Sequence, residues 1–179
     1  IPRLKRLRSA PSRSAAKIEE AFLSLMTADE RLKDLRAGLR VVDLGAAPGG
    51  WSWYMATQGL QVTAVDKAKL RPAAMETQRV AHYQVDGFKY QPAKPVDWLL
   101  CDMLEQSRRI SDLVIAWIRR GHCQHALFNL KLPMRKHYQE ARSCLDRIAD
   151  QIPASYSIRA KQLYHDRQEI SVCCLRVRA

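Results

Sequence analysis

Short apolar stretches, each carrying an aspartate at or near its end, recur along the first hundred residues of the chain. They read "LRVVDLG", "LQVTAVD", "RVAHYQVDGF" and "VDWLLCDM", and the aspartates are Asp43, Asp66, Asp86 and Asp102. Each stretch has the length and apolar character of a strand, and other segments separate them. Strands that alternate with helices form a parallel sheet, which binds its ligands at the carboxyl ends of the strands.

The remaining segments complete this pattern. Helical spacing predicts helices over about 15–35, 49–59, 107–120 and 135–151, and "CQHALFNLKLP" predicts a fifth strand. Two last strands, about 154–163 and 168–177, are joined by a short turn, so one of them runs antiparallel. We predict an α/β, Rossmann-like fold with a mostly parallel seven-stranded sheet, one antiparallel strand and helices on both faces. Residues 1–13, with Pro2 and Pro11, form a predicted basic arm or linker before a domain over 14–179.

The charge of the chain indicates its partner. Thirty Lys and Arg against eighteen Asp and Glu give a net charge of +12, and six basic residues with no acidic one lie between Arg3 and Lys17. Such a surface attracts nucleic acid, although the same charge also serves solubility alone. No apolar run is long enough to span a bilayer, and the first residues lack the apolar core of a signal peptide.

The five cysteines are odd in number and none forms a CxxC pair. They lie in apolar contexts, so we predict reduced core residues of a cytoplasmic protein. The cysteines and histidines show no metal-ligand spacing, so no metal site is expected.

"VVDLGAAPGGW" predicts a strand, a turn of small residues and the start of a helix. Gly45, Ala46, Ala47, Gly49 and Gly50 would let the backbone approach a ligand, next to the free N–H groups of the helix. Pro48 would fix the conformation of the turn. The spacing is GxxxGG instead of the GxGxxG of dinucleotide enzymes.

The aspartates make the expected cofactor more specific. Asp66 lies where such folds place an acid against ribose hydroxyls, and Asp86 could accept from an adenine amino group. Each alone could be a loop cap. Together with Asp43 and Asp102 they predict an acidic rim that suits the cationic S-adenosylmethionine and repels the pyrophosphate of NAD.

Lys131 lies between two leucines at the tip of the fifth strand, where an unpaired lysine is rarely found. By topology it faces Asp102, and Lys17 and Glu169 are further candidates for the same site. A ribose hydroxyl needs a base, so a lysine there must have a lowered pKa, which a neighbouring lysine, a sulfonium and burial would favour. Lys17 alone could equally be a solvated helix residue, and Glu169 a surface strand residue.

"DLGAAPGGW", "VDGF", "CDM", "FNLKLPM" and "QLYHDRQEISV" together resemble the ribose 2′-O-methyltransferases related to FtsJ, and among them the bacterial enzymes that act on a cytidine of 23S ribosomal RNA. The resemblance covers the chain from about Ser12. It implies a class I methyltransferase fold and a Lys-Asp-Lys-Glu tetrad at Lys17, Asp102, Lys131 and Glu169, with Lys131 as proton acceptor.

The resemblance also implies cofactor contacts, which it places at Ser14, Ala47, Pro48, Gly49, Gly50, Asp66, Asp86 and Asp102. We add Asp43, Gly45 and Trp51 to the predicted cofactor site. The resemblance further implies an amino-terminal RNA-binding domain, which we expect to be absent from this chain. The expected partner is 23S ribosomal RNA, with no DNA or membrane, and the expected state is a monomer.

Aromatic side chains near the strand ends offer surfaces on which a base could stack. The candidates are Trp51, Trp53, Tyr54, His137 and Tyr138, although the two tryptophans could equally be helix packing. Two other functions stay open at this point: a non-catalytic RNA-binding module that keeps the fold, and a nucleotide-dependent dehydrogenase, which the glycine spacing and the acidic rim disfavour.

Overall fold

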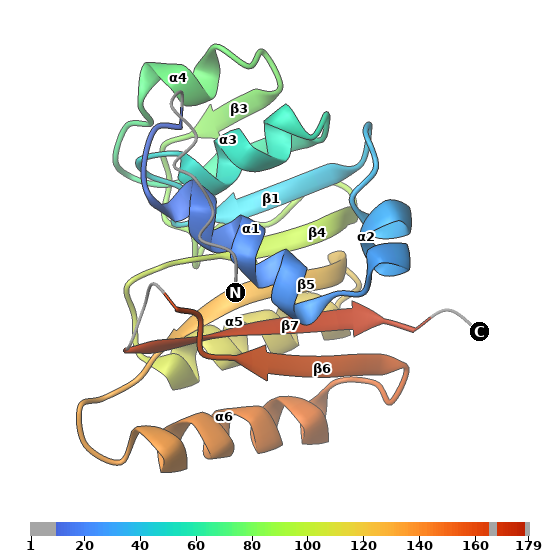
Figure 1. Cartoon of the computed structure of the whole chain (residues 1–179), viewed down its shortest axis with the longest axis vertical. Helices are drawn as coiled ribbons and strands as arrows, with labels where there is room; N and C mark the ends of the chain where they lie inside the picture. Colours follow the sequence, from blue (N-terminus) through green and yellow to red (C-terminus); the bar gives the residue numbers. More distant parts are fainter. Residues whose placement is uncertain (1–9, 165–167, 178–179) are drawn as a thin grey trace.

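A computed structural model describes residues 10–164 and 168–177 of the chain. Its strands form one seven-stranded sheet in the order β3-β2-β1-β4-β5-β7-β6 (Figure 1). The strands are β1 Arg40–Leu44, β2 Gln61–Val65, β3 Val80–Tyr83, β4 Val96–Cys101, β5 Cys123–Lys131, β6 Tyr156–Lys161 and β7 Glu169–Arg176. Strand β7 pairs antiparallel with both β5 and β6, and the other neighbours pair in parallel. The predicted sheet is confirmed.

Helices cover both faces of the sheet. They are α1 Ser14–Leu25, α2 Ala28–Asp34, α3 Gly50–Thr57, α4 Pro72–Met75, α5 Ser107–Arg119 and α6 His137–Gln151. Helices α1 and α3 lie on one face, and α5 and α6 lie on the other (Figure 1). Alternate strand residues feed the two cores: Leu100 and Leu127 pack under α1 and α3, while Leu99 and Phe128 pack under α5 and α6.

The helix predicted over 15–35 is wrong in one respect, because the chain forms two helices there. At Thr27 the backbone becomes extended, its hydroxyl accepts from Glu30 N at 3.2 Å, and the Glu30 carboxylate accepts from Thr27 N at 2.7 Å. This capping box starts a new helix at Ala28. The apolar spacing continues across the break, so periodicity alone did not reveal it.

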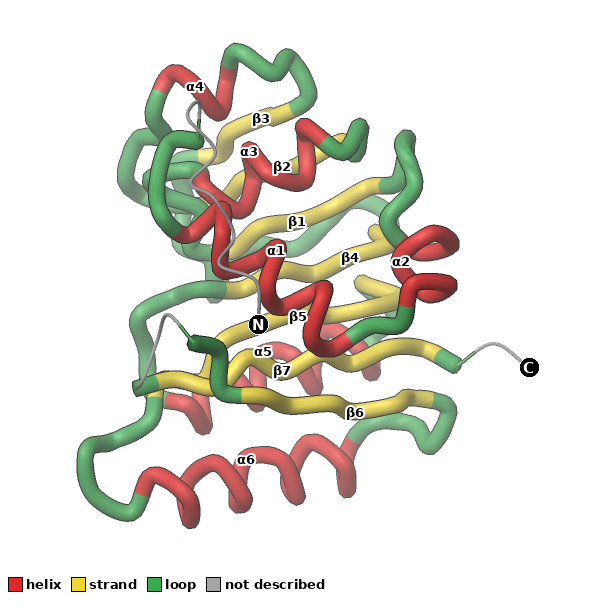
Figure 2. Tube along the Cα trace, in the orientation of Figure 1, coloured by secondary structure: helices red, strands yellow, loops and turns green. Residues whose placement is uncertain are grey.

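The termini of the parallel strands define two edges of the sheet. Figure 2 shows the loops that follow β4 and β5 leaving the sheet on the same side. The predicted basic arm falls outside the described residues up to Ser9, and the described segment from Ala10 leads into α1. Within the described part of the chain, no helix has both the length and the apolar character needed to cross a bilayer. All five cysteines are buried free thiols, as predicted.

Candidate active site

A turn of small residues joins β1 to α3, at the point where the strand order reverses between β1 and β4. Gly45 and Gly49 have positive φ angles of 76° and 106°, which glycine adopts without strain. A Cβ at Gly45 would lie 2.6 Å from Met103 Cγ, on the loop after β4. The turn therefore lies close against the neighbouring loop.

A cavity of about 530 Å³ opens beside this turn, and Gly45, Ala47, Asp66, Asp86 and Asp102 are among the residues that line it. Asp66 accepts N–H bonds from Ala47 at 3.0 Å and from Ala68 at 2.8 Å, which fixes its carboxylate at the end of β2. Three of the four predicted aspartates thus lie on one cavity wall.

Asp86 has an ion-pair partner at this wall. Its carboxylate lies 3.0 Å from the Lys67 ammonium and accepts from the Phe88 N–H at 3.0 Å. The hydrogen bond from Lys67, followed by that from Phe88, lowers the pKa of Asp86, so the group is a carboxylate at neutral pH. Asp86 lies three residues beyond the end of β3, because that strand ends at Tyr83.

Asp43 corrects the prediction of a four-membered rim. It lies inside β1 with 1% of its surface exposed, and it is not among the residues that line the cavity. Its Oδ2 accepts from the Ser52 hydroxyl at 2.6 Å, while Oδ1 is buried without a hydrogen-bond partner. Burial raises the pKa of Asp43 to about 7. The carboxyl group therefore lies beneath the turn instead of at the rim.

Two serine hydroxyls lie over the start of α3. Ser12 Oγ and Ser14 Oγ are 2.6 Å apart, and a Cβ at Gly50 would lie 2.1 Å from Ser14 Oγ. Only a residue without a side chain fits there. The predicted cofactor contacts at Ser14, Pro48, Gly49 and Gly50 lie at or beside this helix start and are not among the residues that line the cavity, so they stay predictions.

The two tryptophans of α3 are core residues. Trp51 is 3% exposed and Trp53 is 8% exposed. Their rings cannot receive a base from the surface, so that prediction is wrong for both, and the alternative of helix packing holds. A contact between Trp51 and the cofactor stays a prediction. Because the ring is buried, only the main chain of Trp51, at the start of α3, could make this contact. Tyr138 at the start of α6 is 70% exposed and remains a candidate for stacking.

Lys17, Asp102, Lys131 and Glu169 come from four parts of the chain and meet in one ion-pair network. The Lys131 ammonium lies 2.8 Å from Asp102 Oδ1 and also bonds Glu169 Oε2, and the Lys17 ammonium lies 3.2 Å from Glu169 Oε1. The predicted convergence is confirmed. The lysine and Asp102 side chains are 20 to 25% exposed, whereas that of Glu169 is 4% exposed. Glu169 therefore lies behind the groups that a substrate could reach.

Strand pairing places these side chains. The antiparallel register of β5 and β7 sets Lys131 directly opposite Glu169, and Asp102 follows β4, the other neighbour of β5. The Ser107 hydroxyl donates to the Lys131 carbonyl oxygen at 2.6 Å and ties the strand end to α5. The antiparallel strand is thus what brings Glu169 to the carboxyl edge of the parallel strands.

The structure does not show the expected lowering of the Lys131 pKa. Burial alone would lower it, but contact with the Asp102 and Glu169 carboxylates outweighs burial, and the pKa of Lys131 is raised. Burial also raises the pKa of Glu169, against the opposing effect of Lys131. Lys131 is therefore an ammonium at neutral pH.

Asn129 belongs to the same network and was not predicted. Its side-chain amide donates to Asp102 Oδ1 at 2.9 Å and to Glu169 Oε1 at 3.1 Å, and the residue is 1% exposed. The signal in the sequence was its position two residues before Lys131, because alternate residues of a strand share a face.

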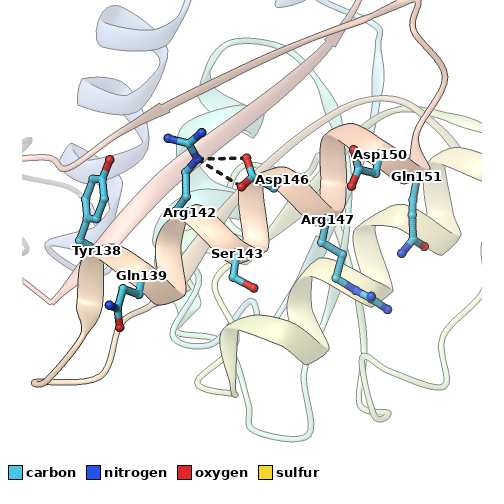
Figure 3. Close-up of a pocket in the computed structure, with 8 residues that line it drawn as sticks. All are labelled: Tyr138, Gln139, Arg142, Ser143, Asp146, Arg147, Asp150 and Gln151. Atoms are coloured by element: carbon cyan, nitrogen blue, oxygen red, sulfur yellow. Dashed lines mark hydrogen bonds and ion pairs between the residues drawn. The ribbon is translucent and has the colours of Figure 1, made fainter.

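A second hollow, of about 560 Å³, lies along the outer side of α6 (Figure 3). All its lining residues come from that one helix, and Arg142 pairs there with Asp146 at 3.2 Å. None of its lining residues belongs to the network. Among residues 10–164 and 168–177, no group of three or more His, Cys, Asp or Glu could hold a metal ion.

Comparisons with known proteins agree with this geometry. A model of the FtsJ-like methyltransferase family matches residues 10–152. The ribosomal RNA large subunit methyltransferase M of Xylella fastidiosa (strain 9a5c) is 52% identical over 172 residues, which are 96% of this chain and 49% of that protein. The protein of the same name from Xanthomonas campestris pv. campestris (strain B100) is 51% identical over 176 residues, 98% of this chain and 51% of its own. The chain thus spans about half the length of these curated relatives.

Solved structures share the fold at low sequence identity. The pre-rRNA processing protein fibrillarin of Methanococcus jannaschii has a TM-score of 0.67 at 13% identity, over 94% of this chain and 78% of its own. Magnesium protoporphyrin IX methyltransferase of Synechocystis PCC 6803 with bound SAH has a TM-score of 0.62 at 13% identity, over 92% and 82%. These likenesses confirm the class I methyltransferase fold.

Proposed function

The chain belongs to the FtsJ-like methyltransferase family, and from this premise we propose that it transfers a methyl group from S-adenosylmethionine to the 2′-hydroxyl of a cytidine in 23S ribosomal RNA. The observation that carries the proposal is the network of Lys17, Asp102, Lys131 and Glu169 at the edge of an acidic cavity. The names of the relatives support the large-subunit RNA as substrate. The cytidine and the ribose oxygen rest on the resemblance of the motifs.

The residues of the cavity fit this cofactor. Asp66, Asp86 and Asp102 give an otherwise basic protein an anionic wall, which suits a cofactor that carries a sulfonium and an ammonium. Gly45, Gly49 and Gly50 leave space for a close approach of the backbone. When bound, S-adenosylmethionine would supply an electrophilic methyl group. Asp66 would hold its ribose, Asp86 its adenine, and the turn and Ser14 its amino-acid end.

Lys131 is the proposed proton acceptor. A neutral amine has two N–H bonds and one lone pair. If Asp102 and Glu169 each accept one N–H, as they do in the structure, the lone pair points away from both carboxylates. As the substrate 2′-hydroxyl reacts with the methyl group that the cofactor would supply, the Lys131 amine would accept its proton. Lys17 holds Glu169 from the other side and limits its freedom to move.

Positioning of the hydroxyl contributes more to the rate than the base does. The hydroxyl must approach the methyl carbon in line, and Asp102 lines the cavity while it also bonds Lys131. One carboxylate thus fixes the proton acceptor relative to the cofactor site. The bound cofactor would add positive charge beside Lys131, which favours the neutral amine.

Lys131→Ala tests the proposal. Transfer of tritiated methyl groups to unmodified 23S ribosomal RNA should fall by about 10²- to 10⁴-fold, the usual contribution of a general base, while calorimetry shows unchanged cofactor binding. Lys33→Ala on the exposed part of α2 is the matched control and should keep full activity. Mapping of the modified ribose tests the cytidine. RNA binding by the unaltered protein without methyl incorporation would instead indicate a non-catalytic RNA-binding module.

A further inference from the structure

We propose that Asn129 is a positioning residue of the site, whose side-chain amide holds the Asp102 and Glu169 carboxylates in the arrangement that presents the Lys131 amine to the substrate hydroxyl. This inference rests on the role of Lys131 proposed above. The amide has two N–H bonds, and the structure uses both, one for Asp102 at 2.9 Å and one for Glu169 at 3.1 Å. No other neutral side chain of the described residues bridges these two carboxylates.

The orientation of the Asn129 amide is fixed from the next strand. Ser171 lies directly opposite Asn129 in the register of β5 and β7, and its hydroxyl donates to Asn129 Oδ1 at 2.7 Å. The oxygen of the amide therefore faces Ser171, and its nitrogen faces the carboxylates. Ser171 is 2% exposed, so water does not compete for this bond.

The charges around the pair explain why a neutral donor is useful there. Lys131 of β5 and Lys17 of α1 face the two carboxylates, Glu169 comes from β7, and Asp43 of β1 lies further below. When Lys131 gives up its proton, Lys17 is the remaining ammonium among the described residues that pairs with this carboxylate pair, through Glu169. Two carboxylates that share a buried site repel each other unless other donors stabilise them.

Asn129 supplies that stabilisation in both protonation states of Lys131. Asp102 Oδ1 accepts from both Asn129 and Lys131, so the amide competes with the ammonium for the same oxygen. A carboxylate that already accepts an N–H bond attracts a neighbouring proton less strongly. Loss of Asn129 should therefore raise the pKa of Lys131, which decreases the fraction of neutral amine at a given pH.

Asn129→Leu removes the donors at nearly constant volume. The pH dependence of trace acylation of Lys131, with exposed Lys33 as internal reference, measures its neutral fraction without any substrate. We expect about tenfold slower acylation of Lys131 at pH 8, which corresponds to one pH unit. The pH profile of methyl transfer should move to alkaline pH by the same amount, with the rate recovered at high pH.

Two further variants make the test decisive. Gln124→Leu is the matched control on the same strand. It removes an amide that donates to the Asp97 carboxylate at 3.4 Å. Because Asp97 does not belong to the network, this variant should leave both pH profiles unchanged. Ser171→Ala keeps the Asn129 amide and removes only the hydroxyl that orients it, so it should shift both pH profiles in the same direction by a smaller amount. This variant replaces Asn129→Leu if Asn129→Leu does not fold.

The outcomes separate the two proposals. Unchanged or faster acylation of Lys131, or a loss of methyl transfer that is equal at every pH, would overturn the role of Asn129. Absence of methyl transfer by the unaltered protein would overturn the proposed function. In that case the acylation profile still decides whether Asn129 controls the proton on Lys131.

Discussion

Lys131 explains why a lysine stands between two leucines at the end of a core strand. Its ammonium is half-buried but has two carboxylate partners, and this pairing offsets the loss of hydration that burial imposes on a charge. The same carboxylates raise its pKa, which opposes its use as a base. A lysine that acts as a base beside two carboxylates needs neighbours that weaken the attraction of these carboxylates for its proton. This is the role proposed for Asn129.

Asp43 gives a prediction about stability at the residue scale. Its pKa is about 7 in the folded protein and near its ordinary value of 3.8 when unfolded. Because the pKa of Asp43 is higher in the folded protein, its contribution to the free energy of unfolding is complete below about pH 4 and is lost as the pH rises through about 7. The side chain of the Asp43→Asn variant cannot ionise. The melting temperature of this variant minus that of the unaltered protein should therefore be several degrees higher at pH 8 than at pH 5, with both proteins measured without cofactor.

Thermal unfolding of both proteins at the two pH values checks this prediction. Glu19→Gln on the partly exposed side of α1 is the control, and its effect on the melting temperature should be the same at both pH values. A constant difference between Asp43→Asn and the unaltered protein across this range would mean that Asp43 is already ionised when folded.

At the scale of the elements, the capping box at Thr27 is what divides one apolar periodicity into α1 and α2. Thr27→Ala removes the hydroxyl that accepts from Glu30 N, so we expect a loss of about 1 kcal/mol in the free energy of unfolding. Thr57→Ala is the matched control, because that hydroxyl only bonds the Tyr54 carbonyl within the last turn of α3. In chemical denaturation, Thr57→Ala should lose less than half as much free energy of unfolding as Thr27→Ala. Equal losses in the two variants would contradict the capping role of Thr27.

The elements also indicate how far the sequence could predict this structure. Strand-length apolar runs predicted all seven strands, and the hairpin-like end of the chain predicted the antiparallel one. The burial of Asp43 and the role of Asn129 were missed, because both depend on which side of a strand faces which neighbour. The capping box was missed because "TADE" lies within a continuous helical spacing, where "T" followed three residues later by "E" was the available signal.

At the scale of the whole molecule, two groups of cations can be compared, one in the segment before α1 and one at the edge of the sheet opposite the proposed site. The described chain begins at Ala10 and places Ser12 and Ser14 beside Gly50, at the edge that carries the proposed site. Residues 1–9 precede this segment in the sequence and carry four cations, namely Arg3, Lys5, Arg6 and Arg8. The opposite edge carries a comparable set of exposed cations, namely Lys33, Arg36, Arg119 and Arg120.

This arrangement predicts which cations the RNA contacts. Each contact with a phosphate of single-stranded RNA adds about 0.7 to the slope of log Kd against log salt concentration. Replacing the four cations of residues 1–9 with glutamine should therefore make the slope shallower by up to about 3, with weaker binding at low salt. The same replacement at the opposite edge removes an equal charge and should leave the slope nearly unchanged. Equal changes in both variants would mean that net charge, and not the basic segment before α1, determines RNA binding.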